Sequence, residues 1–245
     1  MAAPVLSPVL SRASRLTTVR DIAELRDLEA GQRCFIVATG PSLGRLPLTL
    51  LADDFVIGVN RAYLALRQGL PHIDILLVAD PAAYHTYHEE LEAAPVACRL
   101  YRSNVHDLVT AKGHDPRRSL NYPFHVEPWM DEGVFARDLA GGTYRGATVV
   151  LEAVQVAYYM GCSEVYVLGC DLDYSGAATH FYAGGPHEEA SRTVMPIDRA
   201  RKSMMVAKSV YETEGRVLLN ATAGGSLEEI GRIDFLSLFN RKGLA

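Results

Sequence analysis

Short apolar runs alternate along the chain with stretches whose apolar residues have helical spacing. A run such as Phe35-Ile-Val-Ala38 has no polar alternation, which is typical of a strand buried on both faces of a parallel sheet. We expect such strands at residues 33–38, 55–59, 73–79, 97–102, 162–169 and 216–220. Strands that alternate with helices predict an α/β fold, with a mostly parallel sheet and helices on both of its faces.

Helical spacing predicts helices over residues 18–30, 82–93 and 147–160, with short helical turns at 46–51 and 62–68. The stretch 188–213 also has helical spacing, and Pro196 must divide or kink it.

The same pattern predicts one domain over residues 18–245, because no linker or repeat interrupts it. We expect residues 1–17 to form a loose N-terminal tail. Residues 103–146 are rich in Pro, Gly, His and Arg and have no sustained period, which predicts an irregular insert. A long irregular segment in a compact domain commonly builds or covers a site. The polar loop at 174–190 is expected to form a lid over that site.

Composition narrows the classes of function. The chain has 245 residues, and at 49% hydrophobic content it can bury a sizeable core. A net charge of −5 without a long basic run argues against sequence-independent nucleic-acid binding. No apolar run approaches the roughly 20 residues of a membrane-spanning helix; peripheral membrane association and self-association stay open. The four cysteines have no CxxC spacing, which favours a reducing cytoplasm.

The first strand opens into Thr39-Gly40-Pro41-Ser42, the turn around which we expect the site to be organised. Gly40 allows an approach of backbone to ligand that a Cβ would obstruct, and Pro41 stops the strand. The Ser42 hydroxyl, or the free amides after Pro41, can face an anion. Such a turn is where α/β proteins commonly bind a nucleotide phosphate, although an ordinary strand-exit turn has the same residues.

Other predicted strands also end in polar side chains. In a parallel sheet the carboxyl ends of the strands share one edge, so these side chains are expected to converge on a ligand. Each is also a common turn former or helix cap, as Asp80 before Pro81 illustrates. The strand-end residues are Thr39, Asn60, Asp80, Asp171, Asp173, Asn220 and Thr222.

Two further features suggest phosphate chemistry. Gly146-Ala-Thr148 precedes an apolar helix, and the free amides there can receive a phosphate, while Thr148 is also a suitable N-cap. Asp171 and Asp173 are two residues apart just beyond a strand, a spacing that can hold Mg²⁺ or Mn²⁺ against a diphosphate.

His180 is the preferred candidate for a general base, because it lies in a polar loop and its ordinary pKa suits proton removal from a hydroxyl. His187 is the rival, and Tyr174 and Tyr182 are candidates for orienting a leaving phosphate. The chain has no GxSxG nucleophile elbow, no Walker lysine and no Cys/His spacing for zinc.

These motifs resemble two related families. Ile36-Val-Ala-Thr-Gly-Pro-Ser-Leu43, Val59-Asn60 and Asp80-Pro81 resemble donor-binding elements of the small bacterial sialyltransferases that use CMP-sialic acid. Residues 146–171 are similar to their central helix and strand, and residues 220–227 to their terminal nucleotide-contacting segment. Gly40-Pro-Ser-Leu43 and Gly169-Cys-Asp171 also resemble the MptE-like domain of 6-hydroxymethylpterin diphosphokinases, which occurs in flagellin-modifying transferases too.

The resemblance implies a Rossmann-like transferase domain that binds an activated nucleotide donor through Gly40, Ser42, Asn60 and residues near Thr148. In the sialyltransferases a lid histidine is the base, and tyrosines stabilise the departing phosphate without a metal. This chain has Asp80 where those enzymes carry Asn, and Asp173 near their Tyr, which leaves a variant assisted by Mg²⁺ or Mn²⁺ open.

We therefore expect a cytoplasmic glycosyltransferase of surface-glycan or glycoconjugate synthesis. Its donor would be a nucleotide-activated sugar, such as a CMP-sugar, its acceptor a hydroxyl of a glycan or small molecule, and it would require no cofactor. One alternative is diphosphate transfer from ATP to a pterin alcohol, with the metal ion at Asp171 and Asp173. The other is a nucleotide-binding module without catalysis.

Overall fold

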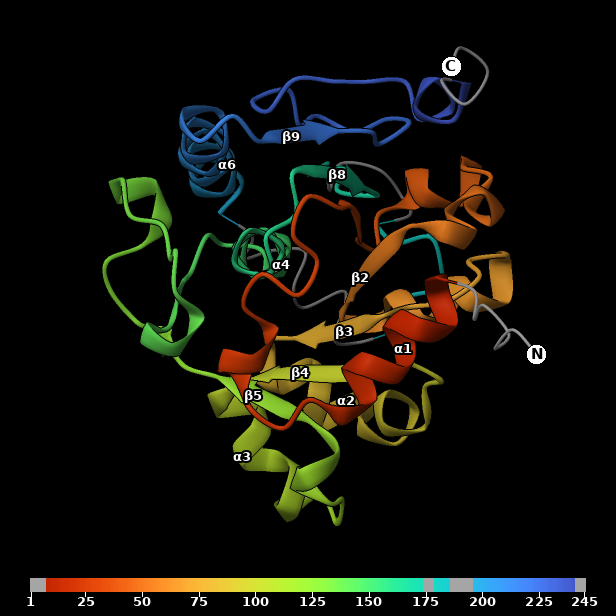
Figure 1. The fold of residues 1–245 in the computed structure, drawn as a ribbon, viewed down its shortest axis with the longest axis vertical. Coiled ribbons are helices and arrows are strands. Elements are labelled where there is room, and N and C mark those ends of the chain that lie inside the picture. The colour runs from red at the N-terminus through yellow and green to blue at the C-terminus, as the bar shows by residue number, and fades with distance from the viewer. Residues whose placement is uncertain (1–7, 174–178, 186–195, 241–245) are drawn as a thin grey trace, which may run out of the picture.

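A computed structural model describes residues 8–173, 179–185 and 196–240. Within them, seven parallel strands form one sheet that runs from β5 at the bottom of Figure 1 to β9 at the top. The order is β5 (Leu120–Tyr122), β4 (Cys98–Arg102), β3 (Ile75–Val78), β2 (Phe55–Val59), β1 (Arg33–Val37), β8 (Glu164–Leu168) and β9 (Val217–Asn220). The α/β prediction is confirmed, and each predicted strand is present with its ends shifted by two residues at most.

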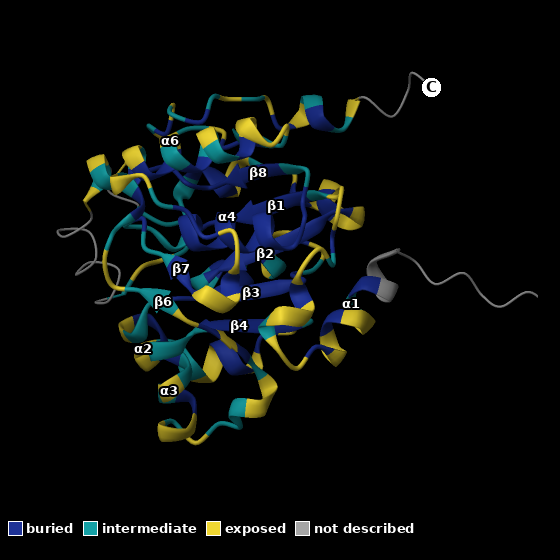
Figure 2. Ribbon diagram, turned by 60° about the vertical axis from the view of Figure 1, so that its left-hand side comes forward, coloured by how far each residue is buried: buried dark blue, intermediate teal, exposed yellow. Residues whose placement is uncertain are grey.

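Helices cover both faces of this sheet. One face packs against α1 (Pro8–Thr18), α4 (Val149–Tyr159) and α6 (Ile197–Thr213). The other packs against α2 (Pro81–Ala93), α3 (Ser103–Ala111) and the 3-10 helices Pro41–Arg45, Leu48–Asp53 and Asn60–Gln68. The strands are buried throughout, while exposed residues lie on the outer helices and loops (Figure 2). Their lack of polar alternation follows from this burial on both faces.

Two expectations for the N-terminal region are wrong. Most of the predicted tail forms α1, whose Leu16 is buried in the core, and residues 1–7 lie outside the described part. The helix predicted over 18–30 is reduced to the 3-10 turn Ile22–Leu25, because Asp21 caps a new start there and Asp27 adopts a positive φ of 55°.

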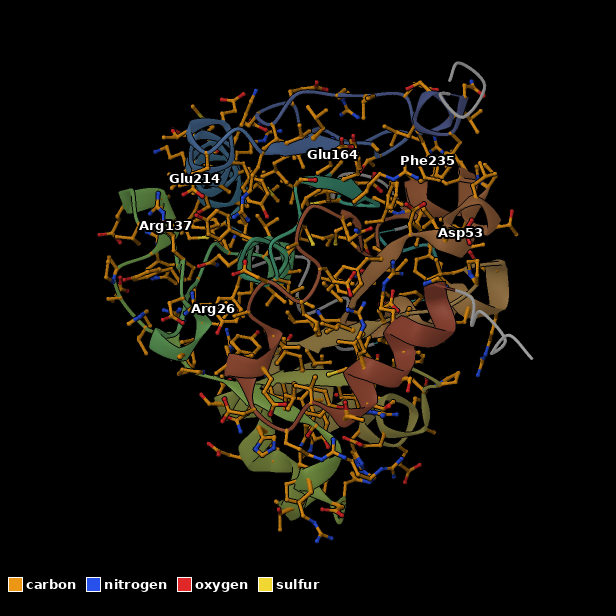
Figure 3. All side chains as sticks on the ribbon, viewed as in Figure 1. Arg26, Asp53, Arg137, Glu164, Glu214 and Phe235 are labelled. Atoms are coloured by element: carbon orange, nitrogen blue, oxygen red, sulfur yellow. The ribbon has the colours of Figure 1, made fainter. Side chains whose placement is uncertain are left out.

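The insert 103–146 is more regular than its composition predicted. It begins with α3 and adds β5 to the edge of the main sheet. Two short parallel strands, β6 (Phe124–His125) and β7 (Thr143–Tyr144), follow. The insert is tied to α6 through an ion pair of 3.2 Å between Arg137 and Glu214, which lie close together in Figure 3.

The strand order reverses between β1 and β8, since the chain builds outward from β1 to β5 and then returns to the other side of β1. At such a switch point the connections leave in opposite directions and open a crevice at the carboxyl ends of the strands. None of the helices in the described ranges is long and apolar enough to cross a membrane.

Helix α1 is held to the sheet by buried charges. The Arg12 guanidinium lies 3.3 Å from Glu29 and 3.7 Å from Asp74, and it donates to the backbone oxygen of Asp54 at 3.0 Å. Its side chain is only 7% exposed, so the two carboxylates depend on it for compensation. Burial raises the pKa of Glu29, with Arg12 and Arg15 opposing the shift.

We predict that Arg12→Ala lowers the free energy of unfolding by about 3–5 kcal/mol, because it leaves buried carboxylates unpaired. Arg15→Ala is the matched control: Arg15 pairs with the same Glu29 at 3.2 Å, but its side chain is 52% exposed. Its loss should cost about 0–1 kcal/mol. Urea unfolding of both variants measures the difference, and equal effects would contradict this account of α1.

Candidate functional site

A cavity of about 340 Å³ lies along the carboxyl edge of the sheet, across the switch point. Residues at the ends of β1, β2, β3, β4 and β8, the N-terminus of α4 and the 179–182 segment all contribute to its wall. Among the predicted site residues, those that line it are Thr39, Gly40, Asn60, Asp80, Thr148, Asp171, Asp173, His180 and Tyr182. Residues far apart in sequence thus share one cavity, as the strand-end argument required.

Gly40 and Asp171 form the close contact at the centre of the site. The Ser42 amide donates to Oδ2 of Asp171 at 2.9 Å, and the Gly40 amide donates to the Gly169 oxygen at 2.7 Å. A Cβ on Gly40 would lie 2.4 Å from Oδ2 of Asp171. Glycine is therefore required here for space, since its φ of −65° is ordinary. Asp171 is buried, and its Oδ1 has no hydrogen-bond donor among the described residues.

Asn60 provides a second buried acceptor in the cavity. It lies directly after β2 with a φ of 48°, a left-handed conformation that asparagine tolerates better than most residues. Its Oδ1 is buried and, like that of Asp171, meets no donor in the described part of the chain. Buried polar atoms are nearly always paired in proteins, so two such acceptors in one cavity point to a ligand that carries donors.

The N-terminus of α4 opens onto the cavity. Thr148 is its N-cap, and its side chain accepts from the Val150 amide at 3.4 Å. The preceding residue, Ala147, has a φ of 67°, and a Cβ on Gly146 would lie 2.3 Å from Leu151. The helix start is therefore shaped by close backbone packing, and its free amides and dipole favour an anion.

His180 and Tyr182 enter the cavity from the segment that follows β8. Their rings stack with centroids 5.1 Å apart, and Nδ1 of His180 lies 2.9 Å from the Thr179 hydroxyl. The segment is anchored by the Phe181 amide, which donates to the Thr39 oxygen at 3.0 Å. Arg61 also lies 4.7 Å from the Tyr182 ring centroid. The predicted residues Tyr174 and His187 lie outside the described residues.

Several predicted ligand contacts are placed elsewhere. Pro41, Ser42 and Gly146 lie beside the cavity without lining it. Asn220 is buried, donates to the Leu227 oxygen at 2.7 Å and accepts from the Thr222 amide at 2.9 Å. The Thr222 hydroxyl accepts from the Cys170 amide at 3.3 Å. Asn220 and Thr222 therefore hold β9 and the turn after β8 together.

The predicted site lacked four lining residues with polar or aromatic side chains: Arg61, Arg102, Trp129 and Glu152. Arg102 ends the strand predicted at 97–102, so the strand-end rule itself could have found it. Glu152 is the one charged residue within the apolar helix α4, which is also a sequence signal. Trp129 comes from the insert, and only the tertiary structure reveals its place beside Arg145, 4.1 Å from its ring centroid.

The described residues contain no group of three or more His, Cys, Asp or Glu side chains that could hold a metal ion. Asp171 and Asp173 both line the cavity, but Asp171 already uses one oxygen on the Ser42 amide, and Asp173 is exposed. Two carboxylates can suffice for Mg²⁺ only when substrate phosphates complete its coordination.

Solved structures that resemble this fold are glycosyltransferases. The MAf glycosyltransferase from Magnetospirillum magneticum AMB-1 is 17% identical with a TM-score of 0.53; the match covers 97% of this chain and 40% of that one. The sialyltransferase CstII from Campylobacter jejuni, in complex with the substrate analogue cytidine-5′-monophosphate, is 13% identical with a TM-score of 0.56, covering 83% and 85%. At these identities the likeness shows the Rossmann-like fold alone. The present chain spans about two fifths of the MAf protein.

The sequence comparison identifies the family. The model of the 6-hydroxymethylpterin diphosphokinase MptE-like family matches residues 10–177, more than half of the 245 residues. The chain therefore belongs to the MptE-like family, which confirms that resemblance. No curated protein matches the chain.

We predict that Gly40→Ala destabilises the protein by about 1–3 kcal/mol, because the new methyl group must displace the Asp171 carboxylate. Gly44→Ala is the matched control in the same 3-10 helix, since a Cβ there has nothing within 4 Å. Its effect should stay within about 0.5 kcal/mol. Thermal unfolding measures both, and an unaffected Gly40→Ala variant would contradict the close contact.

Proposed function

We propose that this protein is a transferase that binds a nucleotide-activated sugar, with a CMP-sugar as the leading candidate, and transfers the sugar to a hydroxyl acceptor in surface-glycan or glycoconjugate synthesis. The observation that carries this proposal is the pair of unpaired buried acceptors, Asn60 Oδ1 and Asp171 Oδ1, in one cavity at the switch point. Ribose and sugar hydroxyls are donors of the kind these oxygens need.

The phosphate of the donor would lie between the Gly40 turn and the N-terminus of α4. The absence of a side chain at Gly40 permits close approach, and the first amides of α4 donate toward the cavity. The switch point at β1 and β8 is the general position of nucleotides in open α/β sheets. A structure of CST-II, 12% identical with a TM-score of 0.51 over 82% of this chain and 86% of that one, was solved with a trisaccharide acceptor and CMP.

In the proposed reaction, the acceptor oxygen attacks the anomeric carbon of the donor sugar. A new glycosidic bond forms while the bond between that carbon and the phosphate oxygen breaks, and the nucleotide leaves with the electron pair. His180 takes the proton of the attacking hydroxyl. Tyr182 would donate a hydrogen bond to the departing phosphate, a role also proposed for Tyr174, which lies outside the described residues.

A second candidate is diphosphate transfer from ATP to a pterin alcohol. It is favoured by the name of the family and by Asp171 and Asp173, which both line the cavity. These carboxylates would hold Mg²⁺ or Mn²⁺ against the ATP phosphates, and the metal would neutralise charge on the transferred group. A nucleotide-binding module without catalysis is the third candidate.

A nucleotide-binding panel separates the first two candidates. We expect CMP or CDP to raise the melting temperature of the protein in the absence of a metal, because binding to the folded state stabilises it. ATP with MgCl₂ should have little effect. Stabilisation by ATP with MgCl₂ alone would support the diphosphokinase instead, and bound nucleotide that is never consumed would support the non-catalytic module.

We predict that His180→Ala lowers kcat by about 10²- to 10⁴-fold without lowering the melting temperature, since it removes the general base. The reaction is followed as CMP release from CMP-N-acetylneuraminic acid in the presence of a saccharide acceptor. His85→Ala is the control, because His85 is exposed on α2 and does not line the cavity. Full turnover by His180→Ala would remove this residue from the mechanism.

A further inference from the structure

The end of β4 brings a buried ion pair to the cavity wall. Nη1 of Arg102 lies 3.2 Å from Oε1 of Glu152, whose other oxygen accepts from the Tyr122 hydroxyl at 2.7 Å. The side chains of Arg102 and Glu152 are 13% and 4% exposed, and both residues line the cavity. The carboxylate is therefore fully engaged by the protein itself.

Arg102 is fixed in place without using its whole guanidinium. Nε donates to the Asn104 side chain at 2.9 Å, and the guanidinium carbon lies 4.5 Å from the Phe124 ring centroid. With Nη1 on Glu152, the remaining Nη2 has no hydrogen-bond partner in the described ranges. A fixed arginine with a free nitrogen is suited to a carboxylate or phosphate, because little side-chain entropy is lost on binding.

The surrounding charge also favours an anion. Arg145, which lines the same cavity, is close enough to Glu152 to lower the pKa of that carboxyl, although burial raises it overall. The buried Nε of Arg145 meets no acceptor in the described part of the chain. Two arginines and one carboxylate leave an excess of positive charge. Asp80, the nearest acid on the neighbouring strand, uses Oδ1 to cap α2 at the Ala82 amide.

This cluster lies away from the nucleotide end of the cavity. Strand β4 is the third neighbour of β1, and adjacent strands are about 4.8 Å apart, so the end of β4 is about 14 Å from the Gly40 turn. A nucleotide at the β1–β8 switch point would extend its activated group along β2 and β3 toward β4. The ligand atoms that reach Arg102 are then those of the sugar.

We propose that Arg102, positioned by Glu152, binds an anionic group on the sugar, so that the donor is a nucleotide-activated sugar acid. The inference rests on the proposed function and deepens it by naming the class of sugar. A purely structural role, in which Arg102 only neutralises Glu152, is the competing explanation.

The test measures dissociation constants by calorimetry for two pairs of probes that share a nucleotide: UDP-glucuronic acid with UDP-glucose, and CMP-N-acetylneuraminic acid with CMP. The variants are Arg102→Gln, the double variant Arg102→Gln/Glu152→Gln, and the control Arg117→Gln. Arg117 is 88% exposed on its side chain, pairs with Asp115 and lies outside the cavity.

We expect Arg102→Gln to weaken binding of the acidic sugar nucleotide by about 10- to 100-fold, as for loss of a hydrogen bond between charged groups. Binding of the matching nucleotide alone, or of UDP-glucose, should be unchanged. The double variant removes both buried charges and should regain the melting temperature that the single variant loses. Its affinity for the acidic sugar should stay low, and Arg117→Gln should behave as the wild type.

Restored affinity in the double variant, or equal losses for the acidic probe and its partner, would overturn the inference and leave Arg102 a structural residue. Binding of CMP or UDP without binding of either sugar acid would overturn it as well. If no nucleotide bound at all, the proposed function would fail, and the inference with it.

Discussion

The hydrogen bond from the Ser42 amide to the Asp171 carboxylate is the contact on which the site depends. It joins the turn after β1 to the turn after β8, the two loops that border the switch point. The two turns can meet only because residue 40 has no Cβ, as Oδ2 of Asp171 occupies that space. The Ser226 amide then donates to the Asp171 backbone oxygen, so the loop after β9 packs on the same turn.

Polar groups at the cavity fall into two kinds, and the difference carries the functional argument. Glu152 and Asp80 have their oxygens engaged by neighbouring side chains or amides, which makes them parts of the scaffold. Asn60 and Asp171 each keep one buried oxygen without a donor in the described residues. Leaving such an atom unpaired costs free energy, so these two oxygens mark where a ligand contributes most. The cations Arg102 and Arg145 extend the same logic to an anion.

Much of this arrangement could be predicted from the sequence, because strand ends in a parallel sheet share an edge. Thr39, Asn60, Asp80 and Asp171 were placed together by that rule alone, and the cavity contains all of them. The rule could not separate residues that face the cavity from residues that stitch loops together, and Asn220 and Thr222 belong to the second kind. It also missed α1, since the burial of Arg12 against Glu29 and Asp74 depends on partners far along the chain.

By itself, the sequence determined the alternation of buried strands and helices, the glycine turn and the polar strand ends, because these follow from local periodicity and from the space that each residue occupies. The tertiary structure decided which side chains keep unpaired atoms in the cavity, that the insert brings Trp129 to it, and that Glu152 pairs with Arg102. Such pairings arise between residues that only packing brings together, and no local pattern encodes their distance.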